Sequence, residues 1–298
     1  MNCPPVDVVV PTRDRPELLR EAVDAALAQD YPGTVAVYVV DDRSERPPSA
    51  DPRVVTLANT RTPGLAGARN TGILAGNGEF VAFCDDDDVW LPGKLRRQVE
   101  ALTVSGADVA CCGIRISCGG GTVDRTLRAE RITLPDLLRS RLTELHPSTF
   151  VLRRAALAGG LGLVDEEIPG SYGEDYELLL RAARRGAILN VPEVLAEVRW
   201  HPRSYFGGRW DTISTALQWL LERYPEFAAE PRGRARVTGQ IAFARAAAGA
   251  RGDAVRWAGR TLRGNAREPR AYLALAVASG AVSAEGVLAR LHTRGRGL

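Results

Sequence analysis

The chain has 298 residues, of which 45% are hydrophobic and 25% are charged, with a formal net charge of +3. These values are typical of a soluble globular protein, and no apolar run reaches the ~18–20 residues that a membrane-spanning helix needs. The first residues, MNCPPVDVVVPTRD, lack a basic stretch followed by a long apolar one, so we expect no signal peptide and a cytoplasmic protein. Five cysteines without a CxxC pair argue against structural disulfides and a zinc site.

The positive charge is concentrated at the C-terminal end. Residues 212–298 contain fourteen arginines and six acidic residues, a net charge of +8, which leaves −5 for the remainder of a chain whose total is +3. Such a tail suits an anionic membrane surface, an acidic acceptor or nucleic acid, or it is the solvated face of ordinary helices. Composition alone does not distinguish these roles, because it does not show which arginines share a face.

Residues 6–112 have the pattern of alternating strands and helices. Apolar runs predict strands at residues 6–10, 35–40, 53–57, 80–84 and 107–112, and helices begin near Pro16, Gly64 and Lys94. This order is typical of a doubly wound, mostly parallel α/β sheet flanked by helices. Because the carboxyl ends of neighbouring parallel strands meet at one edge, residues 11–13, 41–42 and 85–88 are expected in one crevice.

Four consecutive aspartates, Asp85 to Asp88, follow the strand at 80–84 directly and precede Trp90 and Pro92. Adjacent carboxylates repel one another, so a bound cation or polar ligand would offset their charge. A solvated acidic loop is the alternative, but the position between a buried strand and an aromatic–proline turn favours a site. The chain has neither GxGxxG nor GxxxxGK[ST], so a nucleotide bound here would depend on a metal ion and arginines.

Several separated motifs resemble the family 2 glycosyltransferases of GT-A fold. They are VVVPTRDR, VVDDRS, GLAGARNTGI, GEFVAFCDDDDVWLPGKL, HPSTFVLRRAAL, YGEDYELLLRAARRG and VRWHPRSY, within about residues 5–205. The resemblance implies transfer of a sugar from a nucleotide diphosphate sugar to an acceptor hydroxyl or thiol, with inversion of the anomeric carbon. It also implies Mn²⁺ or Mg²⁺ at the leaving diphosphate. We therefore expect a catalytic domain at 1–211, with a nucleotide half at about 1–112 and an acceptor half at about 113–211.

The resemblance assigns roles at the donor end. Asp85 and Asp87 correspond to the D-x-D pair, with Asp87 the direct metal ligand, while Asp86 or Asp88 contacts ribose or donor sugar. Asp42 corresponds to the carboxylate that recognises the base. Further donor contacts are implied at Pro11, Thr12, Arg13, Arg69, Arg199 and Ser204, and a metal or diphosphate contact at His201.

Some of these roles have alternatives. Arg69 either contacts the nucleotide or braces the acidic turn through an ion pair, and His201 is either a ligand or a structural residue. The family more often has Tyr where Arg13 stands, which leaves the base open. A UDP-sugar is favoured, and a GDP- or dTDP-sugar remains compatible.

The acceptor end is implied by the E-D pair, Glu174 and Asp175. Asp175 corresponds to the general base that takes the acceptor proton, and Glu174 would orient a hydroxyl. The alternative is an ordinary pair of carboxylates at a helix N-terminus. His146, which precedes Pro147 and Ser148, is expected on the acceptor side.

Residues 212–298 are predicted to form an all-α extension, with amphipathic helices near 213–221, 237–248, 253–262 and 271–278. The extension would bind an acceptor or partner, form a homodimer, or pack as an appendage. The acceptor itself is open among a glycan, a small-molecule natural product and a peptide, and peripheral contact with the inner membrane face is compatible with the basic tail.

The sequence disfavours three other functions. A sugar nucleotidylyltransferase expects a glycine-rich loop after the first strand, and PTRDRP has no glycine. A catalytically idle nucleotide-sugar module is disfavoured because both Asp87 and Asp175 are present. A nucleic-acid binder with a basic tail would show steeply salt-dependent affinity, and we expect no nucleic-acid partner.

Overall fold

The computed structural model describes residues 3–43, 49–118, 121–199 and 208–292, and its chain divides into two compact units. The first unit consists of Met1–Leu134, Leu142–Glu166 and Glu174–Trp200. The second consists of Pro135–Arg141, Glu167–Gly173 and His201–Leu298. The second unit therefore includes two short stretches that come before residue 201, which the change in composition after Asp211 does not indicate.

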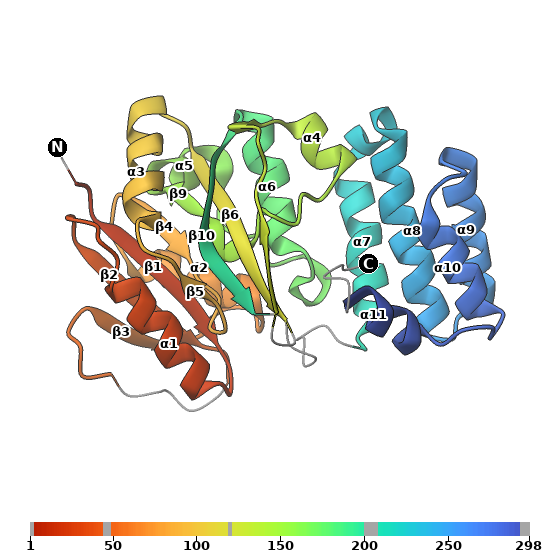
Figure 1. Cartoon of the computed structure of the whole chain (residues 1–298), viewed down its shortest axis with the longest axis horizontal. Helices are drawn as coiled ribbons and strands as arrows, with labels where there is room; N and C mark the ends of the chain where they lie inside the picture. The colour runs from red at the N-terminus through yellow and green to blue at the C-terminus, as the bar shows by residue number, and fades with distance from the viewer. Residues whose placement is uncertain (1–2, 44–48, 119–120, 200–207, 293–298) are drawn as a thin grey trace. The chain divides into compact units, whose positions relative to one another are not determined.

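One mixed sheet forms the centre of the first unit, in the order β3-β2-β1-β4-β9-β6-β10-β5 (Figure 1). Its first four strands are all parallel: β3 (Val54–Ala58), β2 (Val35–Asp41), β1 (Val6–Thr12) and β4 (Phe80–Phe83). Their carboxyl ends meet at one edge, as expected from the sequence. Every residue of β1 is buried, which explains why it is apolar at almost every position instead of alternating.

The other half of the sheet is less regular. Its strands are β9 (Val151–Arg153), β6 (Val109–Cys118), β10 (Ile188–Arg199) and β5 (Val89–Trp90), with β7 (Gly121–Arg125) on β6 and β8 (Arg131–Ile132) on β10. β9 runs antiparallel to both β4 and β6, whereas β6 and β10 are parallel. The α/β class is confirmed, and the antiparallel strand separates two parallel groups.

Helices cover both faces of the sheet. α1 (Pro16–Leu27) and α3 (Lys94–Ser105) share one hydrophobic core with alternate residues of β1, β2 and β4. α2 (Leu65–Ala75) packs on the opposite face, where Gly72 lies against Val9 and Val40. A methyl group on Gly72 would lie 2.5 Å from Val9 Cγ1, so this contact requires glycine. α6 (Glu174–Arg185) completes the long helices of this unit.

Shorter helical segments are distributed over both units. They are α4 (Leu134–Arg139), η1 (Pro147–Thr149), α5 (Arg154–Ala156), η2 (Leu157–Leu161), η3 (Pro169–Ser171) and η4 (Pro225–Ala229). Of these, α4, η3 and η4 lie in the second unit. η1 follows His146 directly and is wholly buried, so it fixes the position of that residue beside the sheet.

The second unit is built from helices. They are α7 (Trp210–Arg223), α8 (Pro231–Ala247), α9 (Arg251–Gly264), α10 (Pro269–Ala278) and α11 (Ala284–His292). α8 contacts α7, α9 and α10 and is buried on several sides, which explains its many alanines and glycines. Thr238 and Thr261 join α8 to α9 through a buried hydrogen bond of 2.8 Å. Among the described helices, none is long and apolar enough to cross a membrane.

The only lysine of the chain, Lys94, is fully buried at the start of α3. Its ammonium nitrogen lies 4.0 Å from the centre of the Trp90 ring. No described residue accepts a hydrogen bond from it. Burial lowers the pKa of Lys94 to about 8. All five cysteines are free thiols, as expected.

Candidate active site

The four aspartates form a tight turn between β4 and β5. The Asp88 N–H donates to the Asp85 carbonyl oxygen at 3.1 Å, which closes the turn. β5 pairs antiparallel with β10 at Trp90, and the Trp90 indole N–H donates to the Ser148 carbonyl at 2.8 Å. The turn is therefore held between two strands of the sheet instead of extending into solvent.

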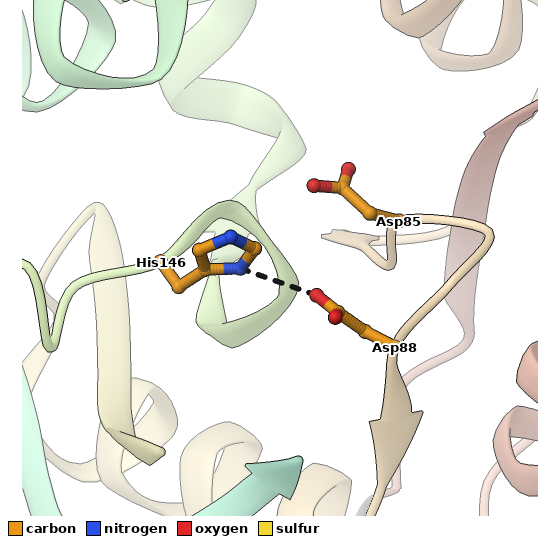
Figure 2. A group of neighbouring side chains, drawn as sticks. All are labelled: Asp85, Asp88 and His146. Atoms are coloured by element: carbon orange, nitrogen blue, oxygen red, sulfur yellow. Dashed lines mark ion pairs between the residues drawn. The ribbon is translucent and has the colours of Figure 1, made fainter. Parts of the chain in front are cut away.

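Asp85, Asp88 and His146 form a group of potential metal ligands, with their ligand atoms within 4.8 Å of one another. Figure 2 shows the ion pair between His146 Nδ1 and Asp88 Oδ2, which are 3.2 Å apart. Ser148 links the two aspartates, because its hydroxyl donates to Asp88 Oδ2 at 2.5 Å and accepts the Asp85 N–H at 3.0 Å. The Arg199 N–H also donates to Asp88 at 3.3 Å.

The electrostatics of this group follow from burial and charge. Burial raises the pKa of Asp88, although the neighbouring His146 opposes the shift. Burial works against the charged imidazolium of His146, but the carboxylate of Asp88, aided by Asp85 and Asp175, outweighs it and raises the pKa of His146 to about 9. His146 is therefore protonated at neutral pH when no cation is bound.

Arg15 binds the two central aspartates. Its Nη1 donates to Asp86 Oδ1 at 3.1 Å and to Asp87 Oδ2 at 2.6 Å. The Thr12 hydroxyl donates to Asp86 Oδ2 at 2.8 Å. Burial raises the pKa of Asp86 to about 6, although the bonds from Thr12 and Arg15 favour its charged form. Thr12 ends β1 and Arg15 precedes α1, so the first strand–helix loop contacts the acidic turn directly.

Arg69 lies beneath the turn and is only 1% exposed. Its Nη2 donates to Asp85 Oδ1 at 2.6 Å, and its Nη1 forms an ion pair with Glu174. The guanidinium also lies 5.4 Å from the centre of the Phe83 ring. Of the two roles considered for Arg69, the described contacts are those of a brace for the acidic turn.

Glu174 and Asp175 begin α6, whose first turn also contains Glu177. A helix N-terminus favours such carboxylates. Burial raises the pKa of Glu174 to about 7, against the opposing effect of Arg69. Asp175 is 8% exposed. Arg69 therefore connects the Glu174–Asp175 pair to the acidic turn within the first unit.

Asp42 organises the entry to α2. Its Oδ1 accepts a hydrogen bond from the Asn59 side chain at 2.8 Å, and its Oδ2 accepts from the Gly64 N–H at 3.1 Å. Gly64 has φ of 117°, a conformation that favours glycine. A role for Asp42 in base recognition stays a prediction.

The structure locates most of the other predicted residues. Pro11 and Thr12 are buried at the end of β1, whereas Arg13 is exposed and lies 3.6 Å from Asp14. The Arg199 side chain forms an ion pair with Glu21 at 2.6 Å. Ser204 and His201 lie outside the described residues.

The group formed by Asp85, Asp88 and His146 suits a divalent cation. Two carboxylates and an imidazole are a donor set that Mn²⁺ accepts, and the buried carboxylates need a positive charge. The sequence predicts Asp85, Asp87 and His201 as ligands, whereas the described residues bring Asp85 together with Asp88 and His146. Asp87 is instead bound by Arg15, and its role as a direct ligand stays a prediction.

Sequence reasoning missed the contributions of Arg15, His146 and Ser148 to the acidic turn. The motif HPSTF is visible in the sequence, but it carries no signal that links it to a turn some sixty residues earlier. The position of Arg15, three residues after the end of β1, was the better signal, because that strand end was expected at the same edge.

Comparison with known families decides the assignment. The profile described as "Glycosyl transferase family 2" matches residues 7–160, which is more than half of the chain. The chain belongs to glycosyl transferase family 2. The resemblance stated from the motifs is therefore confirmed, and the domain is that of a glycosyltransferase.

Two curated relatives illustrate the similarity. The succinoglycan biosynthesis protein ExoO of Rhizobium meliloti is 33% identical over 200 residues, covering 61% of this chain and 57% of that protein. A glucosyltransferase of Escherichia coli, WfgD, is 26% identical over 180 residues, covering 59% of this chain and 68% of that protein. Its name describes transfer of glucose from UDP-Glc to α-D-GlcNAc-diphosphoundecaprenol. The match to ExoO spans less than two thirds of that protein.

Solved structures confirm the GT-A-like fold. TarS residues 1–349 of S. aureus, in complex with UDP-GlcNAc, align with a TM-score of 0.62 at 19% identity, covering 87% of this chain and 81% of that one. A mannosyltransferase of Pyrobaculum calidifontis, in complex with GDP-Man and Mn²⁺, aligns with a TM-score of 0.59 at 21% identity, covering 97% of this chain and 80% of that one.

Proposed function

We propose that this chain transfers a sugar from a nucleoside diphosphate sugar to an acceptor hydroxyl or thiol, with inversion at the anomeric carbon. The observation that carries the proposal is the arrangement around Arg69, whose guanidinium binds Asp85 of the acidic turn and Glu174 of the E-D pair. One rigid, buried contact thus connects a region suited to a donor diphosphate with a region suited to a general base. The family assignment favours sugar transfer over nucleotidyl transfer.

The donor end is assigned to the edge formed by β1, β2 and β4. Asp42 would accept a hydrogen bond from the base, and Pro11, Thr12 and Arg13 would line the base and ribose. Asp85, Asp87, Asp88 and His146 would hold a divalent cation, Mn²⁺ or Mg²⁺, which neutralises negative charge on the leaving diphosphate. The relatives named above with UDP- and GDP-sugars support a nucleoside diphosphate donor, and we favour a UDP-sugar.

The acceptor end is assigned to the start of α6. Asp175 takes the proton from the acceptor hydroxyl or thiol as that atom forms a bond to the anomeric carbon. The bond between this carbon and the diphosphate oxygen breaks on the opposite face, and the nucleoside diphosphate leaves with the electron pair. Glu174 is fixed by Arg69, so it can orient an acceptor or donor hydroxyl without moving.

A ligand screen tests the proposal. Thermal unfolding is followed with UDP, GDP and dTDP and their sugars, each with and without Mn²⁺. We expect at least one nucleoside diphosphate to raise the midpoint only when Mn²⁺ is present, and Asp87→Asn to abolish the increase. No metal-dependent increase with any of these nucleotides would contradict the proposed function.

We further propose that the acceptor is a lipid-linked glycan reached from a membrane surface. The Escherichia coli relative is named for a diphosphoundecaprenol-linked acceptor. In the second unit, α9 exposes Arg256, Arg260 and Arg263, whose spacing of four and three residues puts them on one face, beside the exposed Val255. Such a basic face is attracted to anionic lipids by about 1 kcal/mol per arginine near the surface.

Vesicle sedimentation tests the membrane contact. We expect binding to vesicles with phosphatidylglycerol but not to pure phosphatidylcholine vesicles, and loss of binding when the three α9 arginines are changed to Gln. A matched variant changes three other exposed arginines of the second unit, Arg232, Arg234 and Arg290. Equal loss in both variants would indicate general charge attraction and contradict a role for α9.

A further inference from the structure

Three cationic side chains of the described residues pair with the acidic turn, and they differ in how they can leave it. Arg69 is 1% exposed and is held by two carboxylates, so its displacement would leave buried charges unpaired. His146 can become neutral by losing a proton and then offer a ring nitrogen. Arg15 cannot be deprotonated in a protein, so it releases its carboxylates only by moving away.

The position of Arg15 allows that movement. Its side chain is 27% exposed and comes from the residue before α1, where it makes no side-chain cap contact with the helix. Both of its hydrogen bonds to the turn come from the single atom Nη1, so the rest of the guanidinium fork is not used by these aspartates. Asp86 keeps its bond from Thr12 when Arg15 leaves, so the turn retains a connection to β1.

We propose that Arg15 is an exchangeable counter-cation, which holds Asp86 and Asp87 in the donor-free protein and moves to the donor's diphosphate when a divalent cation binds Asp87. The inference rests on the proposed function, because it assigns the ligand class of the same site. A divalent cation bound to Asp87 would lie close to the Arg15 guanidinium, which is 2.6 Å from Asp87 Oδ2, so the two positive charges would repel each other. A guanidinium released at this edge has the planar donor geometry that matches phosphate oxygens.

If Arg15 is exchangeable, its removal has opposite effects on cation binding and on nucleotide binding. If Arg15 competes with a divalent cation, removing it strengthens cation binding in the absence of donor. If Arg15 also binds the diphosphate, removing it weakens nucleotide binding when the cation is saturating. If Arg15 only braces the turn, its removal weakens both Mn²⁺ binding and nucleotide binding, because the aspartates lose their arrangement.

The experiment measures Mn²⁺ binding and UDP binding separately, with GDP as the second nucleotide. Free Mn²⁺ is followed by electron paramagnetic resonance without nucleotide, and UDP or GDP is titrated by calorimetry at saturating Mn²⁺. For Arg15→Gln we expect the Kd for Mn²⁺ to fall about tenfold, since the charged guanidinium no longer competes for Asp87. We expect the Kd for the nucleotide to rise about tenfold or more.

Two further variants complete the test. Arg15→Lys keeps the charge without the planar fork, so it should bind Mn²⁺ as the unchanged protein does and still bind the nucleotide less well. Arg20→Gln removes one exposed positive charge from α1 and should change neither constant. Circular dichroism establishes that each variant is folded.

The outcomes separate this inference from the proposed function. Weaker or unchanged Mn²⁺ binding in Arg15→Gln, or no Mn²⁺ binding by the unchanged protein, overturns the exchange. Tighter Mn²⁺ binding with unchanged nucleotide affinity overturns the proposal that Arg15 moves to the diphosphate. If both constants change as expected but no sugar is transferred to any acceptor, the exchange stands and the proposed catalytic function fails.

Discussion

Arg69 and Glu174 form a buried ion pair that joins α2 to the start of α6. The same guanidinium reaches Asp85 at 2.6 Å, so the positions of the acidic turn and of the E-D pair depend on one side chain. A glycosyltransferase must hold the anomeric carbon of its donor within reach of the acceptor nucleophile. A shared buried cation is a direct means of keeping the residues that we propose for these two tasks in register.

Replacing Arg69 should therefore destabilise the protein strongly. Arg69→Met leaves the carboxylates of Asp85 and Glu174 without their partner, and breaking a buried ion pair costs about 3–5 kcal/mol. Urea unfolding followed by fluorescence measures the free energy of unfolding. The Arg69→Lys variant should lose less unfolding free energy because it keeps the charge. Arg20→Gln, at an exposed position, serves as the control. An Arg69→Met protein as stable as the original would contradict the bracing role.

The stability of the metal-free protein should fall as the pH rises toward 9. The folded state raises the pKa of His146 to about 9 from an ordinary 6.5, mainly because of Asp88. The folded state therefore binds the proton more tightly than the unfolded state does. The resulting contribution to the free energy of unfolding is complete below about pH 6.5 and is lost as the pH rises through about 9. Unfolding in EDTA between these pH values measures the slope.

His146→Gln should make that slope shallower, by about 1–3 kcal/mol over the interval. The residual slope would come from the remaining titratable groups. Equal slopes in the two proteins would show that His146 does not gain its proton affinity from Asp88.

Asp175→Asn should separate binding from chemistry. The substitution keeps the shape of the side chain but removes the carboxylate that we propose as the base, and a positioned general base contributes about 10²–10⁴ in rate. We expect unchanged Mn²⁺-dependent nucleotide binding and a loss of transfer within that range, measured by chromatography of the released nucleoside diphosphate. Transfer at the original rate would exclude Asp175 as the base.

Ser148→Ala should weaken the acidic turn itself. The hydroxyl donates to Asp88 and accepts from the Asp85 N–H, so its removal leaves a buried and a partly buried polar group with one partner fewer. We expect a loss of about 1–3 kcal/mol in unfolding free energy, together with weaker Mn²⁺ binding. Ser279→Ala, at an exposed position after α10, provides the comparison. A loss no greater than that of the comparison would argue against the link between the two aspartates.

The parallel half of the fold and the place of the site were predictable because they depend on local patterns. Each buried strand is a nearly continuous apolar run. The polar residues that end or follow a strand, such as Thr12, Asp42 and Asp85, must therefore lie at the shared edge of the sheet. β9 was not predicted, because Val151–Arg153 is three residues long and gains its strand character from its neighbours β4 and β6.

Most partners of the aspartates were the part that sequence could not supply. The ion pair of Arg69 with the acidic turn was one of two alternatives, but the contacts of Arg15 and His146 were not anticipated. Which cation pairs with which carboxylate depends on how α2, η1 and the first loop meet the turn in space. The importance of these three cations arises from tertiary contacts with residues far away in the chain.

Because Lys94 is buried against Trp90, its chemical labelling can report local opening of the protein. No other lysine competes for an amine-directed reagent, and with its pKa lowered to about 8 a large fraction of Lys94 carries the reactive neutral amine in mildly alkaline buffer. Because the side chain is fully buried, acylation of Lys94 must await separation of α3 from the sheet. The rate of Lys94 modification, followed by mass spectrometry, would therefore report how often α3 separates from the sheet, and a ligand that stabilises their contact would slow the modification.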